Sequence, residues 1–130
     1  MSKEILPSAA SRAIVHSDMV TALAKDGQAI IDTLTPEKAH LLHMAVGIAG
    51  EAGELLDAVK KAVIYNKPLD VINVIEELGD LEFYMEGLRQ GACVSREESL
   101  EYNKAKLGVR YAGMKYSDGA AQERADKQGE

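Results

Sequence analysis

A short break separates two long stretches of this sequence that both have the spacing of an amphipathic helix. Residues 36–65 and 70–89 lie on either side of Asn66-Lys67-Pro68, and a proline inside a helix removes a backbone hydrogen bond. Apolar residues in the second stretch recur three or four positions apart, as on one face of a helix. Because so short a break favours antiparallel neighbours, we expect a helical hairpin.

Shorter helices are expected on both sides of this hairpin. Residues 8–24 have apolar side chains at helical spacing, and Ser95 to Glu98 has the form of a capping box that begins a helix ending near Val109. A threonine, a proline and an acid at residues 35–37 form another helix start. Nothing in the sequence alternates as a β-strand does. The predicted fold class is all-α, an antiparallel bundle of four or five helices.

The length and composition suit one domain. The chain has 130 residues, of which 46% are hydrophobic. We predict a single all-α domain over residues 1–116 and a polar, flexible tail over residues 117–130. Two long helices with broad apolar faces leave more hydrophobic surface than a 14.0 kDa monomer covers, so oligomerisation is expected to complete the bundle.

The charge and the cysteine content restrict the partners. The formal net charge is −6, and phosphate backbones of nucleic acids are bound by clustered Lys and Arg. The first residues lack the apolar run of a signal peptide, and the longest uncharged stretch, residues 39–50, is too short to span a bilayer. The one cysteine, Cys93, permits no disulfide framework and is interpreted as a small apolar filler near a helix end. We expect a cytoplasmic protein that binds neither nucleic acid nor membrane.

Two pairs of acids lie in otherwise apolar parts of the hairpin. Glu51 and Glu54 are three residues apart, as are Glu77 and Asp80, and residues at this spacing share one helix face. Counted from the break, both pairs stand at the same height on helices whose axes would lie about 8–10 Å apart. The alternative is that each acid points to solvent on a charged face. We predict instead that the four carboxylates converge.

Converging carboxylates require compensation. Two unit charges about 4 Å apart repel by about 4 kcal/mol at an effective dielectric of about 20, so either pKa values rise or cations bind. Oxygen ligands at this density suit Mg²⁺, with Mn²⁺ as a substitute. Gly47, Gly50 and Gly53 in the same helix either allow close packing or leave room for a ligand. His40 and His43 either contact that ligand or are ordinary helix residues.

The acidic stretches resemble those of a known family. "GEAGELLDAVKK" followed by "EELGD" is similar to the paired boxes of the MazG-type all-α nucleoside triphosphate pyrophosphohydrolases, Glu-Glu-x-x-Glu and Glu-Glu-x-x-Asp. The second box is complete, whereas Gly50 replaces the leading acid of the first. A third stretch, "YNKAKLGVRYAGMKYS", resembles the family's Asn-x-x-Lys-Leu-x-x-Arg-Tyr segment. The matches fall within residues 40–117.

The resemblance implies a reaction and a set of site residues. Such enzymes cleave a nucleoside triphosphate between the α- and β-phosphates, giving the monophosphate and pyrophosphate. The implied Mg²⁺ ligands are Glu51, Glu54, Glu77 and Asp80. The residues implied on the phosphate or nucleoside side are Asn103, Lys106, Arg110 and Tyr111. The resemblance also implies a homo-oligomer, with a tetramer favoured over a dimer.

Residue chemistry is consistent with this reaction. An acidic site binds a triphosphate only when cations bridge the two, and such cations lower the pKa of an attacking water. Glu54, with Glu51 beside it, is predicted to be catalytic by orienting or deprotonating that water. Lys106 and Arg110, one turn apart, are predicted to neutralise the β- and γ-phosphates, the alternative from their spacing alone being that both are solvated surface residues.

Two rings complete the predicted substrate contacts. His43 is predicted to stack on or hydrogen-bond the ligand. Tyr84, one turn past Asp80, is also predicted to contact the substrate. The alternatives are that its hydroxyl forms a hydrogen bond with an acid or that the ring only packs.

Other functions are compatible with the same acids. A phosphoribosyl-ATP pyrophosphohydrolase or a dUTP/dCTP-restricted hydrolase would differ in base selection, which carboxylates do not determine. A helical oligomerisation module with a structural divalent ion belongs to a different class, because protein groups would fill every coordination position. Release of pyrophosphate distinguishes an enzyme from such a module.

Overall fold

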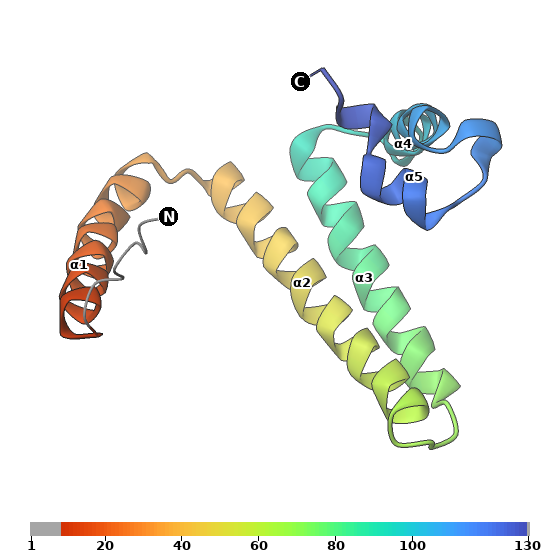
Figure 1. Ribbon diagram of the computed structural model, residues 1–130, viewed down its shortest axis with the longest axis horizontal. Helices are drawn as coiled ribbons and strands as arrows, with labels where there is room; N and C mark the ends of the chain where they lie inside the picture. The colour runs from red at the N-terminus through yellow and green to blue at the C-terminus, as the bar shows by residue number, and fades with distance from the viewer. Residues whose placement is uncertain (1–8, 130) are drawn as a thin grey trace, which may run out of the picture. The chain divides into compact units, whose positions relative to one another are not determined.

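The computed structural model describes residues 9–129, with side chains from His16 onward except that of Lys25, and every regular element in this range is helical (Figure 1). The elements are α1 (Ala9–Thr33), α2 (Pro36–Val63), α3 (Val71–Ala92), α4 (Arg96–Arg110), η1 (Ala112–Met114), α5 (Asp118–Glu123) and η2 (Ala125–Lys127). The predicted all-α class is therefore confirmed for the described residues.

Hydrogen-bonded caps fix the starts of the three central helices. Thr35 Oγ1 accepts from the amide of residue 38 at 3.3 Å, and Asp70 Oδ1 accepts from the Asn73 amide at 3.0 Å. At the start of α4, Ser95 Oγ accepts from the Glu98 amide, and Glu98 Oε2 accepts in return from the Ser95 amide. These caps explain why α2 and α4 begin where the sequence predicts.

Helix α1 differs from the prediction at its C-terminal end. Its predicted start, Ser8, lies outside the described residues, and the helix continues past the predicted end, Ala24, to Thr33. The Gln28 side chain donates to Asp32 Oδ1 at 2.8 Å across one turn. One glycine inside a helix costs about 1 kcal/mol relative to alanine, and α1 continues through Gly27 despite this cost.

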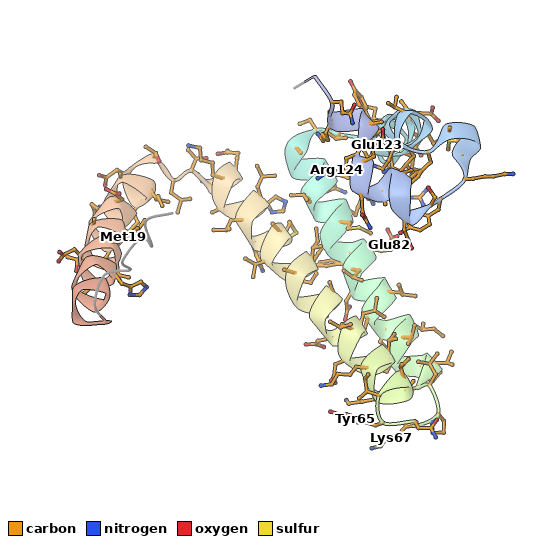
Figure 2. All side chains as sticks on the ribbon, in the orientation of Figure 1. Met19, Tyr65, Lys67, Glu82, Glu123 and Arg124 are labelled. Carbon is orange, nitrogen blue, oxygen red and sulfur yellow. The ribbon has the colours of Figure 1, made fainter. Side chains whose placement is uncertain are left out.

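Helices α2 and α3 pack side by side in opposite directions (Figure 1). His40 Nε2 lies 2.9 Å from the Gly87 carbonyl oxygen, the Met44 side chain lies against Gly87, and the Tyr84 ring lies against Gly47. As residue numbers rise along α2, those of the contacted residues fall or hold along α3. The short break at residues 66–68 thus joins an antiparallel hairpin, and Figure 2 shows Tyr65 and Lys67 at its turn.

The three glycines of α2 have different surroundings. A Cβ atom at Gly47 would overlap the Tyr84 ring, so close packing requires glycine there. A Cβ atom at Gly50 or Gly53 would meet no atom within 4 Å. Of the two explanations predicted from the sequence, close packing therefore applies to Gly47.

Much of the apolar surface of the hairpin is exposed. The buried side chains among those described are Met44, Ala58 and Glu77. Large apolar residues at least 59% exposed include Leu42, Val46, Leu56, Ile72, Ile75 and Phe83. Asp57 and Lys61 form an ion pair across one turn of α2, at 2.7 Å. The hairpin therefore buries few side chains by itself.

The C-terminal segment contains more structure than its composition suggests. Within the part of the chain predicted as a polar tail, α5 and η2 form, and both pack against α4. The chain divides into two compact units inside α2, residues 1–39 and 40–130, and this segment belongs to the second. One domain over residues 1–116 stays a prediction. Among the described residues, no helix has both the length and the apolar character needed to cross a membrane.

Cys93 is not the apolar filler that the sequence suggested. It lies beyond the end of α3, as predicted, but it is exposed and has a left-handed backbone, with φ 57° and ψ 39°. Its amide donates to the Gln90 carbonyl, and the Val94 amide donates to the Arg89 carbonyl. This pattern closes the last turn of a helix and usually has glycine at the left-handed position.

Candidate metal centre

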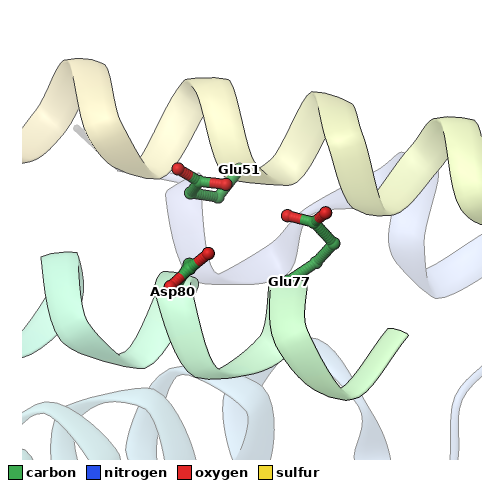
Figure 3. A group of neighbouring side chains, drawn as sticks. All are labelled: Glu51, Glu77 and Asp80. Atoms are coloured by element: carbon green, nitrogen blue, oxygen red, sulfur yellow. The ribbon is translucent and has the colours of Figure 1, made fainter. Parts of the chain in front are cut away.

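Three of the four predicted acids gather between α2 and α3. Glu51 projects from α2, and Glu77 and Asp80 project from adjacent turns of α3, with their carboxylates pointing toward one another (Figure 3). One oxygen atom from each residue lies within 4.8 Å of the others. The spacing of three within α3 and the antiparallel register of the hairpin together produce this cluster.

Glu77 is the buried member of the cluster. Its residue is 7% exposed, whereas Glu51 is half-buried and Asp80 is exposed. Glu77 Oε2 is buried and accepts no hydrogen bond in the structure. Buried carboxylate oxygens are normally paired, so this atom calls for a ligand or a proton. A donor set made only of carboxylates fits a hard divalent cation such as Mg²⁺ or Mn²⁺.

The cluster is electrostatically unfavourable without compensation. The pKa of Glu77 is raised from 4.5 to about 7, first by burial, then by hydrogen bonding with Glu51 and by the negative charges of Glu54, Glu51 and Asp80. Glu77 therefore holds a proton well above the pH at which an exposed glutamate loses it. A divalent cation would compensate the same charges when that proton leaves.

Glu54 lies outside the group of three. It is exposed on α2, although its charge contributes to the raised pKa of Glu77. The same spacing of three separates Glu77 and Asp80, which do lie together, so the spacing alone does not place Glu54 outside the group. Of the four acids predicted to converge, Glu51, Glu77 and Asp80 form the group, and Glu54 interacts with it through its charge. Glu54 is positioned at the edge of the cluster.

Two predicted substrate contacts lie on the hairpin, beside the packed glycine. The ring centroids of His43 and Tyr84 are 6.3 Å apart, and Tyr84 also meets Phe83 edge to face at 5.3 Å. Tyr84 packs against Gly47, so packing is the observed alternative for this side chain. His43 is exposed.

The four remaining predicted residues lie on or just after α4. Asn103 and Lys106 are exposed, and Tyr111 caps the helix with its ring 5.4 Å from the Tyr116 ring. Arg110 forms a two-bond ion pair with Asp126. Sequence reasoning missed Asp126, because no periodic pattern in the polar C-terminal segment indicates which acid folds back.

Comparison with protein-family models, with curated proteins and with solved structures found no match to this chain. What the site can do is therefore judged from the chemistry of its own residues. The cluster offers acidic oxygens, one deeply placed and two accessible, beside an exposed fourth acid. Such a site can hold a divalent cation while leaving coordination positions open on the exposed side.

Proposed function

We propose that this chain is a Mg²⁺-dependent pyrophosphohydrolase that converts a nucleoside or deoxynucleoside triphosphate to the monophosphate and pyrophosphate. The main support is the cluster of Glu51, Glu77 and Asp80, whose buried carboxylate oxygen has no hydrogen-bond partner. The two acidic boxes have the spacing of the MazG-type enzymes, and this resemblance suggests cleavage between the α- and β-phosphates as the reaction. The exposure of Asp80 supports a catalytic over a structural ion, since an accessible side remains for substrate and water.

Each acid has a distinct part in the proposed mechanism. Glu77, Glu51 and Asp80 would hold the cation, which when bound would supply positive charge against the triphosphate and make the attacking water more acidic. Glu54, exposed beside them, orients this water and accepts its proton. The water oxygen bonds to the α-phosphorus as the bond from that phosphorus to the bridging oxygen breaks. The electron pair of that bond leaves with pyrophosphate.

Residues outside the cluster would bind the rest of the substrate. Lys106 and Arg110, one turn apart on α4, would neutralise phosphate charge, and Asn103 and Tyr111 would contact the phosphates or the nucleoside. His43 lies on the hairpin beside Tyr84, from which it would reach the ligand.

Self-association is part of the proposal. The exposed apolar residues of α2 and α3 would pack against a second copy of the chain, completing an antiparallel helical bundle. We propose a homo-oligomer, with a tetramer favoured over a dimer. Light scattering coupled to gel filtration measures this directly, and a monomer at micromolar concentration would contradict it.

The test of the reaction is pyrophosphate release. The purified chain is incubated with each common ribo- and deoxynucleoside triphosphate and Mg²⁺, and pyrophosphate and orthophosphate are measured separately. We expect pyrophosphate from at least one substrate, with rates at least about 100-fold lower in Asp80→Asn and Glu51→Gln. Glu76→Gln is the matched control, because Glu76 is an exposed acid next to Glu77 and lies outside the cluster.

Each other outcome has a defined meaning. Orthophosphate release would place cleavage at a different bond, and no release from any substrate would reject the hydrolase. If Mg²⁺ then still stabilised the oligomer, the helical module with a structural ion would replace it.

A further inference from the structure

Arg110, the last residue of α4, and Asp126, in η2, form a closely paired and largely buried contact. Arg110 Nε donates to Asp126 Oδ1 at 2.6 Å, and Arg110 Nη2 donates to Asp126 Oδ2 at 2.9 Å. The Asp126 side chain is 3% exposed and that of Arg110 is 17% exposed. Both oxygens of the carboxylate are thus used by one edge of the guanidinium.

This edge is also the group that binds phosphate. A guanidinium presents two parallel N–H bonds that match a carboxylate or a phosphate equally well. Asp126 therefore occupies the place that two phosphate oxygens would take. Hydrogen bonding to Arg110 keeps the pKa of Asp126 below its ordinary value, so the carboxylate stays charged at neutral pH.

A hollow of about 500 Å³ lies between α4 and the C-terminal segment, beside this pair. Its lining includes Tyr102, Lys106, Val109, Ala125, Asp126 and Gln128. Lys106 lines the hollow, and Arg110 stands one turn further along α4, where it is bonded to Asp126 of the same lining. Departure of Asp126 would join the hollow to the guanidinium.

We propose that this hollow is an oligophosphate-binding site closed by an internal carboxylate, in which a phosphate chain displaces Asp126 from Arg110 and releases the C-terminal segment. That the natural ligand is the triphosphate of a nucleotide rests on the proposed function. The anion site itself rests on the two-bond pair, the burial of Asp126 and the position of Lys106.

Competition determines which anions open the site. A carboxylate tethered by a short chain competes at an effective concentration on the order of millimolar. Orthophosphate, which replaces only the Arg110 contact, would not displace it efficiently. Tripolyphosphate also reaches Lys106 and gains a second cation. The apparent affinity equals the intrinsic affinity multiplied by the fraction of open molecules, so removal of the Asp126 charge raises it.

The segment is suited to release. Helix α5 spans only Asp118–Glu123, and helices this short are not stable by themselves in water. Ser117 caps it locally, accepting from the Ala120 amide at 3.2 Å. The contact of Asp126 with Arg110 adds a two-bond ion pair to the packing of this segment against α4.

The test measures tripolyphosphate binding by calorimetry in EDTA, so that no cation links the phosphate to the acidic cluster. We expect Asp126→Asn to bind at least about tenfold more tightly than the unchanged chain, and Arg110→Gln combined with Asp126→Asn to lose this gain. Asp118→Asn is the matched control. It removes one charge from the same segment, where Asp118 accepts from the Tyr116 hydroxyl and does not touch Arg110, and we expect a change below about twofold.

A second measurement covers the possibility that Asp126→Asn only loosens the segment. Hydrogen exchange in the unchanged chain should show α5 and η2 amides losing protection as tripolyphosphate saturates the site. Unchanged protection, or a gain in affinity that persists without Arg110, would overturn the proposal. Neither readout depends on hydrolysis, so failure of the proposed function and failure of this site are distinguishable.

Discussion

The Tyr84 ring on α3 lies directly against Gly47 on α2, one turn before Glu51. This contact sets how closely the two helices approach beside the acidic cluster. Glu51 comes from one helix, and Glu77 and Asp80 come from the other. The separation of the helices therefore controls the distance across which the carboxylates share a cation.

Replacing Gly47 with alanine should force α2 and α3 apart. The destabilisation from overpacking against an aromatic ring should exceed the gain of about 1 kcal/mol in helix propensity. We therefore expect a net loss of about 1 kcal/mol in the free energy of unfolding. Urea denaturation measures this loss, and Mn²⁺ affinity should fall with it. An unchanged midpoint would mean that the Tyr84 ring moves aside at little cost.

The matched substitution is Gly50→Ala in the same helix. A Cβ atom at this position meets no atom within 4 Å, so only helix propensity changes. We expect the free energy of unfolding to rise by about 0.5–1 kcal/mol. If substrate turnover falls in this stabilised variant, then Gly50 leaves room for the ligand, which is the second explanation suggested by the sequence.

Glu77 and Glu54 should differ in their effects on the cation. Glu77→Gln removes the buried ligand, and we expect Mn²⁺ affinity to fall by at least about tenfold. Glu54 lies outside the cluster, so Glu54→Gln should lower affinity much less while it reduces the rate of pyrophosphate release. Electron paramagnetic resonance of free Mn²⁺ measures the affinities. Equal losses of affinity would place Glu54 among the direct ligands.

The raised pKa of Glu77 predicts the direction of a pH effect on metal-free stability. Its pKa is about 7 in the folded chain against an ordinary value of 4.5. The folded chain therefore holds this proton more tightly, and the stabilisation is complete below pH 4.5 and is lost as the pH rises to about 7. Urea denaturation in EDTA across this range should show the decline, and Glu77→Gln should remove this part of it. If the stabilities of the unchanged chain and of Glu77→Gln changed in parallel with pH, the effect would not come from Glu77.

The sequence predicted the parts of the fold that depend on local chemistry. The caps at Thr35 and Ser95 and the break before Pro68 are local signals, and the observed helices begin or stop close to them. The spacing of Glu77 and Asp80 is equally local, so their shared position on α3 follows from the helix alone. Adding the register across the break places Glu51 opposite them.

The remaining features depend on how the chain packs. The partner of Arg110 is 16 residues away in a polar segment, where hydrophobic spacing carries no information. Which of Glu51 and Glu54 faces α3 depends on the rotation of α2 about its axis, and the Tyr84 contact with Gly47 helps to determine that rotation. The sequence also does not indicate the left-handed backbone at Cys93, since the residue usual at such a position is glycine.

Cys93 provides a last test of these local rules. Its left-handed backbone places the Cβ atom too close to a carbonyl oxygen, which costs an L-residue about 1–2 kcal/mol, whereas glycine adopts the same conformation freely. Cys93→Gly should therefore raise the free energy of unfolding by about 1 kcal/mol, after the greater entropy of glycine in the unfolded chain is subtracted. Cys93→Ser removes the thiol but keeps the Cβ atom, and it should leave stability nearly unchanged. Thermal denaturation under reducing conditions compares the three chains. Equal gains from serine and glycine would trace the effect to the thiol, and a loss from glycine alone would show that unfolded-state entropy outweighs the backbone strain at the end of α3.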